Sequence, residues 1–119
     1  MTRKIHTPPP EFIHKITSKT IKFYENIFGT SFPFSKLDQV VCPTVRYAGM
    51  ESAGCIVYSE SFFAVKRKEI WTESETIKGC TILMHEISHQ WFGDMVTMKW
   101  WDDLWLNESF ATIISYYAC

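Results

Sequence analysis

Residues 85–109, HEISHQWFGDMVTMKWWDDLWLNES, contain histidine and glutamate side chains of the types that can bind a transition metal. His85 and His89 are four positions apart, so on a helix their imidazoles point the same way, one turn above the other. Catalytic zinc takes three protein ligands and keeps one position open, and two histidines with one glutamate are a known ligand set. Glu108, separated from His89 by 18 residues, is the candidate third ligand. The spacing therefore predicts one Zn²⁺ per chain.

The chemistry expected of such a site is hydrolysis. Relative to Ile77, the two histidines lie at about 80° and 120° around the helix and Glu86 at about 180°. From there the Glu86 carboxylate can reach a water on the metal without binding the metal itself. Zinc lowers the pKa of its water toward about 7, and Glu86 would take the proton and pass it to a leaving amine. The predicted reaction is hydrolysis of an amide bond.

The alternative is that these residues have ordinary structural roles. H-E-x-x-H also arises by chance, and an acid on a helix is usually solvated. On its own helix Glu108 points roughly 200° away from Leu106, so it faces either solvent or a cleft. The zinc interpretation is favoured because the motif lies within a well-marked amphipathic helix and a second helix supplies the acid. No G-x-S-x-G motif or glycine-rich phosphate loop competes with it.

Two helices are predicted to position this site. The first begins after Thr72, which forms a possible capping box with Glu75, and continues to Gly93. Its apolar stripe recurs at three and four positions: Ile77, Cys80, Met84, Ile87 and Trp91. The second begins near Asp102 or Asp103, acids suited to a helix N-terminus. Its predicted stripe is Leu106, Phe110, Ile113, Ile114 and Tyr117.

The upstream sequence predicts one more helix and short strands. Residues 1–10 have the prolines of an extended lead-in, and a helix is predicted from Glu11 to Phe28, before Gly29. Its apolar face is Phe12, Ile16, Tyr24, Ile27 and Phe28. LDQVVC reads as a strand, and YAGMESAG as a loop that leads into a second strand, Cys55–Ser59. The fold class is therefore α+β, with short strands followed by the two helices of the active site.

Composition limits the function classes. The chain has 119 residues, 46% hydrophobic and 21% charged, which fits one small domain. Its net charge of −1 argues against a nucleic-acid partner or an anionic membrane surface. The four cysteines have no C-x-x-C spacing, so free thiols are expected. No signal peptide or membrane segment is recognised, which favours the cytoplasm.

The long segment MHEISHQWFGDMVTMKWWDDLWLNESFA resembles the zinc aminopeptidases of the M1 class. Upstream, AGMES at residues 48–52 occupies the place of that family's exopeptidase motif G-A-M-E-N. The resemblance covers roughly residues 19 to 117. It implies that residues 1–119 are a central part of a thermolysin-like (gluzincin) catalytic domain. The implied activity is removal of single residues from peptides with a free N-terminus.

The resemblance also implies roles for individual residues. His85, His89 and Glu108 would bind zinc, and Glu86 would be the general base. Gly49, Met50 and Glu51 would contact substrate, with Glu51 paired to its terminal ammonium. An internal peptide bond offers no such charge, so this acid would make the enzyme an exopeptidase.

Departures from the family's pattern keep other functions open. Ala48, Gly49 and Ser52 replace the motif's glycine, alanine and asparagine, which predicts altered affinity or side-chain preference. The family's downstream tyrosine, which stabilises the tetrahedral intermediate, has no counterpart, because Tyr116 and Tyr117 are too close to Glu108. A metallo-endopeptidase and a catalytically silent peptide-binding module therefore remain alternatives.

Overall fold

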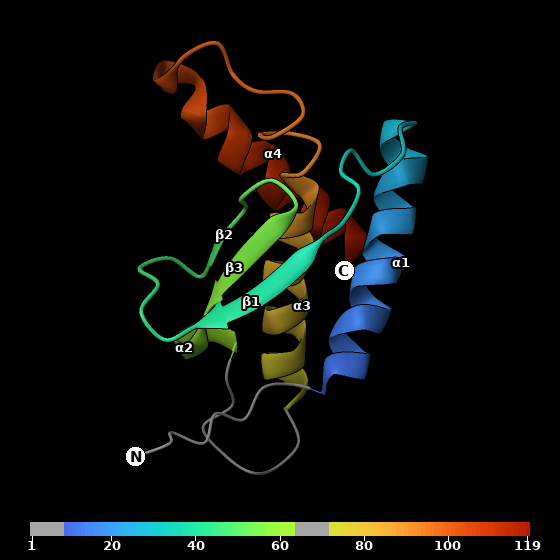
Figure 1. Cartoon of the computed structure of the whole chain (residues 1–119), viewed down its shortest axis with the longest axis vertical. Helices are drawn as coiled ribbons and strands as arrows, with labels where there is room; N and C mark the ends of the chain where they lie inside the picture. The colour runs from blue at the N-terminus through green and yellow to red at the C-terminus, as the bar shows by residue number, and fades with distance from the viewer. Residues whose placement is uncertain (1–8, 64–71) are drawn as a thin grey trace.

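The computed structural model describes residues 9–63 and 72–119, which form a mixed α+β fold (Figure 1). Its elements, in chain order, are α1 (Pro10–Phe28), β1 (Asp38–Cys42), β2 (Gly49–Met50), β3 (Cys55–Ser59), α2 (Glu60–Phe63), α3 (Glu73–Ser88), the short 3₁₀ helix η1 (Trp101–Asp103) and α4 (Leu104–Ala118). The predicted α+β class is confirmed at this level. Most of the predicted lead-in, residues 1–8, lies outside the described residues.

Helix α1 begins and ends close to where the sequence predicts. Pro10 is already helical, so the lead-in prediction was wrong there: proline lacks an N–H, but none is needed in the first turn. Gly29 ends the helix with a φ of 64°, which glycine adopts without strain. Tyr24 is fully buried, and its hydroxyl donates to the Met84 carbonyl oxygen at 2.9 Å. Ile27, predicted on the apolar face, is exposed.

The three strands form one sheet in the order β1-β3-β2. β1 and β3, both predicted, pair in parallel from Asp38 opposite Cys55 to Cys42 opposite Ser59. β2 was predicted to be loop, but its two residues pair antiparallel with β3, Gly49 opposite Tyr58. This short pairing fixes the backbone of the segment that also contains Glu51.

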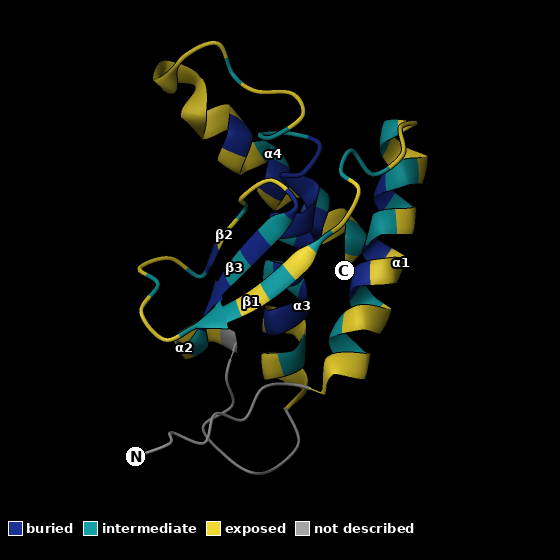
Figure 2. Ribbon diagram, viewed as in Figure 1, coloured by how far each residue is buried: buried dark blue, intermediate teal, exposed yellow. Residues whose placement is uncertain are grey.

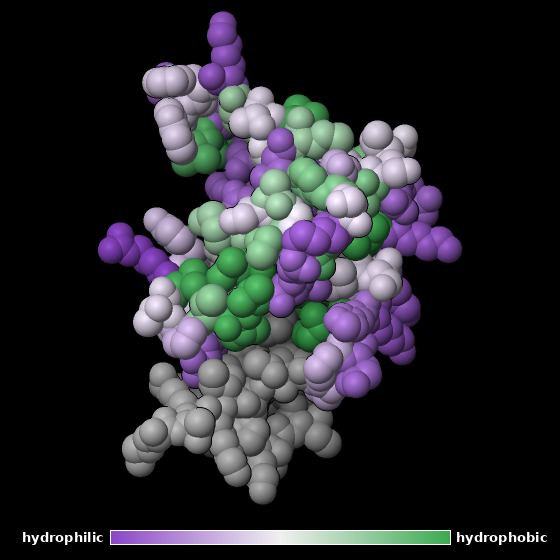
Figure 3. Space-filling view, viewed as in Figure 1, coloured by the Kyte–Doolittle hydropathy of each residue, from purple (hydrophilic) through white to green (hydrophobic). Residues whose placement is uncertain are grey.

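The core lies between the sheet, α1 and α3. Figure 2 shows buried residues concentrated in β3 and along α3. Six buried residues from α1, β3, α3 and the turn after α3 form one cluster: Tyr24, Ile56, Tyr58, Leu83, Ile87 and Trp91. On this face of the molecule, hydrophobic surface gathers over the sheet, and hydrophilic surface predominates over α1 (Figure 3). The four cysteines are free, as predicted.

Helix α3 begins as predicted but ends early. Thr72 caps it through a reciprocal capping box with Glu75. The helix ends at Ser88 with His89 as its C-cap, so the predicted end at Gly93 was wrong. After Ser88 the backbone changes to 3₁₀-type hydrogen bonding: the N–H groups of Gln90 and Trp91 donate to the carbonyl oxygens three residues earlier. Ile77, the first residue of the predicted stripe, is exposed.

Helix α4 packs mainly against α3, and only part of the predicted stripe faces inward: Phe110 stacks on Phe28, and Ile114 packs against the core cluster. Leu106, Ile113 and Tyr117 of the predicted stripe are exposed. The buried positions of α4 are Asn107, Ala111 and Ser115, which follow one another at intervals of four. These side chains are short, which allows a neighbouring helix to pack closely against this face of α4.

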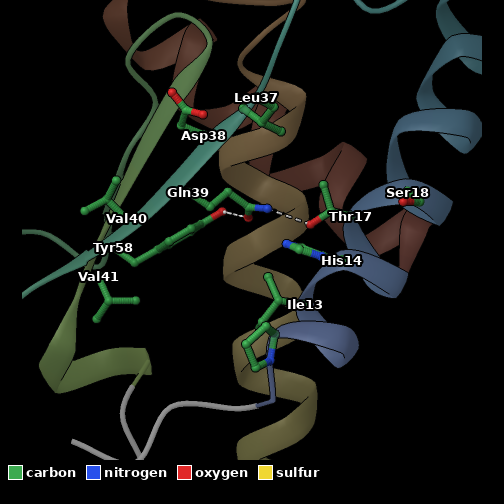
Figure 4. Close-up of a pocket in the computed structure, with 11 residues that line it drawn as sticks. Ile13, His14, Thr17, Ser18, Leu37, Asp38, Gln39, Val40, Val41 and Tyr58 are labelled. Atoms are coloured by element: carbon green, nitrogen blue, oxygen red, sulfur yellow. Dashed lines mark hydrogen bonds between the residues drawn. The ribbon is translucent and has the colours of Figure 1, made fainter.

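A groove of about 610 Å³ separates α1 from β1 (Figure 4). Polar side chains cross it: the Tyr58 hydroxyl donates to Gln39 Oε1 at 3.0 Å, and Gln39 Nε2 donates to Thr17 Oγ1 at 2.9 Å. None of the candidate zinc or substrate residues lines this groove. Its hydrogen bonds tie α1 to the sheet, which is a structural role.

Candidate metal centre

His85, His89 and Glu108 are brought together where the end of α3 meets α4. His85 Nε2 lies 3.1 Å from His89 Nε2 and 3.4 Å from Glu108 Oε2. His89 Nε2 lies 3.8 Å from the same carboxylate oxygen. His85 is in the last turn of α3, His89 is its C-cap and Glu108 is on α4. The packing of the two helices thus creates the triad.

The spacing of these three atoms fits a small tetrahedral cation. Ligand atoms bound at about 2.0–2.1 Å with tetrahedral angles lie about 3.4 Å apart. The observed distances of 3.1, 3.4 and 3.8 Å bracket that value. Two imidazole nitrogens and one carboxylate oxygen are also a donor set that suits zinc. The three residues can therefore hold such an ion without a large rearrangement.

The hydrogen bonds of His89 leave one ring nitrogen free to bind a metal. Its Nδ1 lies 3.1 Å from the Phe92 carbonyl oxygen and 3.2 Å from Asn107 Oδ1. A carbonyl oxygen can only accept, so Nδ1 carries the proton. In a neutral imidazole the lone pair then resides on Nε2, the atom that faces His85 and Glu108.

Burial also keeps His85 in the metal-binding form. Removal from water and the nearby His89 lower the pKa of His85, and these effects outweigh the opposing influence of Glu108. A neutral imidazole is the form that coordinates metal. His89 is almost fully buried, whereas the side chain of Glu108 is 52% exposed. The triad is therefore open to solvent on the side of α4.

Glu86 lies beside the triad and is not part of it. It is buried, and a carboxylate oxygen from it, one from Glu51 and a ring nitrogen of His89 all lie within 4.8 Å of one another. Burial, followed by the charges of Glu51 and Glu108, raises the pKa of Glu86 to about 8. A cation held by the triad would favour the ionised form of this carboxyl group. The arrangement suits a proton acceptor near the metal.

Gly49 makes room for Glu86. A Cβ at position 49 would lie 2.3 Å from Glu86 Oε1, closer than any real contact. Met50, the next residue of β2, is exposed and pairs with Val57. Strand β2 therefore runs directly past the carboxyl group of Glu86, with Glu51 at its end.

Gln90 holds the Glu51 segment in place, and the sequence did not reveal this role. Its side chain is fully buried; Nε2 donates to the Glu51 carbonyl oxygen at 2.9 Å, and Oε1 accepts from the Gly54 N–H at 2.8 Å. Asn107 was missed as well, because its predicted helix face was the exposed one. The sequence feature that could have pointed to both residues is an amide side chain next to a candidate ligand: Gln90 follows His89, and Asn107 precedes Glu108.

Among the residues that the structure describes, no helix combines the length and apolar character of a membrane span.

Comparison with known proteins places this geometry in a family. The model of the peptidase family M1 domain matches residues 12–119. Aminopeptidase 2 of Candida albicans is 39% identical over 111 residues, which are 92% of this chain and 12% of the relative. Aminopeptidase N of Lactobacillus helveticus is 39% identical over 114 residues, 95% of this chain and 13% of the relative. A probable aminopeptidase 2 of Sulfurisphaera tokodaii is 40% identical over 108 residues, 91% of this chain and 14% of the relative.

The chain thus spans about an eighth of the length of these curated relatives. The family model nevertheless covers almost all of it, including both helices of the candidate metal centre. This chain belongs to peptidase family M1.

Proposed function

We propose that this chain is the metal-binding part of a zinc aminopeptidase that removes single residues from the N-termini of peptides. The observation that carries the proposal is the convergence of His85, His89 and Glu108 beside two further carboxylates. Membership of family M1 and relatives named aminopeptidases support the same reaction class. Residues 1–119 would then be part of one thermolysin-like catalytic domain, and the location expected for it is the cytoplasm.

In this proposal each residue has a distinct role. His85, His89 and Glu108 hold one Zn²⁺, which when bound acidifies water and polarises the scissile carbonyl group. Glu86 accepts the proton of the attacking water and delivers it to the nitrogen of the leaving amine. Burial beside other acids favours its protonated form, and a cation held by the three ligands would favour the ionised form that accepts the proton.

Glu51 is proposed to select the free N-terminus. Its carboxyl group lies close to Glu86, at the end of the β2 strand that carries Gly49 and Met50. A terminal ammonium bound there would bring the first peptide bond of the substrate to the metal. An internal bond would leave the carboxylates without a cationic partner, which disfavours an endopeptidase.

The test is release of a fluorophore from aminoacyl amides by the zinc-loaded chain, with Glu86→Gln as the control. The proposal expects hydrolysis of substrates with a free N-terminus, its loss in the Glu86 variant, and zinc binding by both proteins. Cleavage of N-terminally blocked peptides at an equal rate would point to the endopeptidase instead. A zinc-bound chain that captures peptides and releases no residue would point to a peptide-binding module.

A further inference from the structure

Asn107 contacts two of the three candidate metal ligands at once. Its Oδ1 lies 3.2 Å from His89 Nδ1, and its Nδ2 donates to Glu108 Oε1 at 3.4 Å. The side chain is buried on the face of α4 that packs against α3. A single amide therefore bridges the ligand at the end of α3 and the ligand on α4.

The orientation of this amide follows from its partners. The Glu108 carboxylate can only accept, so the NH₂ end of Asn107 faces it. The oxygen end then faces His89, whose Nδ1 carries a proton because the Phe92 carbonyl oxygen also lies within hydrogen-bond distance. Rotating the amide by 180° would set NH₂ against N–H and oxygen against carboxylate, and both contacts would be lost.

The backbone of Gly93 lies close to both the Asn107 amide and the His89 ring. This glycine has a φ of 134°, and a Cβ there would lie 2.6 Å from Asn107 Oδ1 and 3.3 Å from His89 Nδ1. The backbone of the turn after α3 thus fits against the pair, and only glycine leaves space for it. Such close packing limits the movement of both the amide and the imidazole.

We propose that Asn107 is a positioning residue that sets the distance and orientation of His89 relative to Glu108. This inference rests on the proposed metal centre and deepens it. The Phe92 carbonyl alone can fix which nitrogen of His89 is protonated, so the distinct contribution of Asn107 is the link between the two helices. Without that link, each ligand would sample a wider range of positions and would bind a cation less tightly.

The experiment measures zinc affinity of the 119-residue chain by competition with a chelating dye. Asn107→Leu, which has similar volume and neither donor nor acceptor, is expected to weaken zinc binding by about 10- to 100-fold. Asn107→Asp keeps an acceptor for His89 but replaces the donor to Glu108 with a second carboxylate, so it is expected to recover only part of that loss. Ser115→Ala is the matched control: Ser115 is buried two turns further along α4, and its hydroxyl donates to the Thr112 carbonyl oxygen within the helix. Its zinc affinity should equal that of the unaltered chain.

A spectroscopic measurement separates positioning from general packing. With Co²⁺ in place of zinc, the visible absorption bands report ligand geometry, and they should change in Asn107→Leu and not in Ser115→Ala. Urea unfolding of the metal-free proteins checks that the variants are folded. If the Leu variant is not folded, Asn107→Ala takes its place: zinc affinity equal to that of the unaltered chain would overturn the inference, since neither contact of the amide is present.

Unchanged zinc affinity and an unchanged cobalt spectrum in a folded Asn107→Leu variant would show that the bridge does not position the ligands. Failure of the unaltered chain to bind zinc would overturn the proposed metal centre itself, and this inference with it. Loss of binding in His89→Ala together with normal binding in Asn107→Leu would overturn only the inference.

Discussion

Gln90 holds the main chain of Glu51 by donating a hydrogen bond from Nε2 to its carbonyl oxygen at 2.9 Å. The same buried side chain accepts the N–H of Gly54, so both ends of the turn between β2 and β3 are attached to the residue after His89. The proposed amine-binding acid and the proposed metal ligands therefore share one rigid support.

We expect Gln90→Leu to lower the free energy of unfolding by about 1–3 kcal/mol, because the buried N–H of Gly54 loses its acceptor. In the active enzyme it should also raise KM for substrates with a free N-terminus, since Glu51 is no longer held. Gln39→Leu is the control, because Gln39 bonds to Thr17 and Tyr58 in the groove between α1 and β1. A KM effect of equal size in both variants would contradict the positioning role of Gln90.

Glu51→Gln tests selection of the N-terminus directly. The substitution keeps the size of the side chain and removes the charge that would pair with an ammonium. Hydrolysis of free peptides should fall by at least tenfold in kcat/KM, about 1.4 kcal/mol, while blocked peptides are affected little. The comparison requires paired free and N-acetylated substrates of the same sequence. An equal loss on both would assign Glu51 to some other role.

Removal of zinc should destabilise the chain by mass action. At a free zinc concentration of 100 times Kd, binding to the folded state alone adds about 2.7 kcal/mol to the free energy of unfolding. Thermal unfolding with zinc and with EDTA measures this difference. His89→Ala and Glu108→Gln should abolish it, whereas His14→Ala, at an exposed position on α1, should retain it. Stabilisation that survives in both ligand variants would place the ion elsewhere.

The stability of the metal-free chain should fall as the pH rises toward 8. Burial and the neighbouring acids raise the pKa of Glu86 from 4.5 to about 8, so between these values the folded state binds more protons than the unfolded state. The contribution of Glu86 to the free energy of unfolding is therefore fully present below pH 4.5 and is lost as the pH rises through 8. Asp94, whose pKa is raised to about 6 mainly by burial, contributes in the same direction at lower pH.

Urea unfolding in EDTA across this pH range provides the measurement. Glu86→Gln should remove the part of the decline between pH 6 and 8, because glutamine does not titrate. Asp94 remains in that variant, so its own contribution at lower pH, which the lowered pKa of His85 opposes, should be unchanged. A full decline in the Glu86 variant would mean that another group is responsible.

The sequence predicted elements well where local chemistry determines them. The Thr72 capping box and the glycine stop at Gly29 are interactions among near neighbours, and both are present. The spacing of His85 and His89 also needs only a helix to bring the two rings together. These features required no knowledge of how the elements pack.

Features that depend on packing were predicted less well. Hydrophobic periodicity assigned Leu106 and Ile113 to the buried face of α4, but the helix packs through Asn107, Ala111 and Ser115. A contact between two helices can favour short side chains at the interface. The hydrophobic pattern of the α4 sequence does not reveal that preference. The pairing of Gly49 and Met50 with β3 was missed because a two-residue strand has too little pattern to detect.

The distribution of tryptophans on α4 and the segment before it affects how this protein can be followed by fluorescence. Trp91 is buried in the core, whereas Trp100, Trp101 and Trp105 are exposed to water in the folded chain. Native-state emission from these four tryptophans will therefore already be weighted toward the long wavelengths of hydrated indole, and unfolding will shift their emission little. Substituting phenylalanine at the three exposed positions would make Trp91 the dominant emitter in the described part of the chain, and thus a reporter of the core beside the candidate metal ligands.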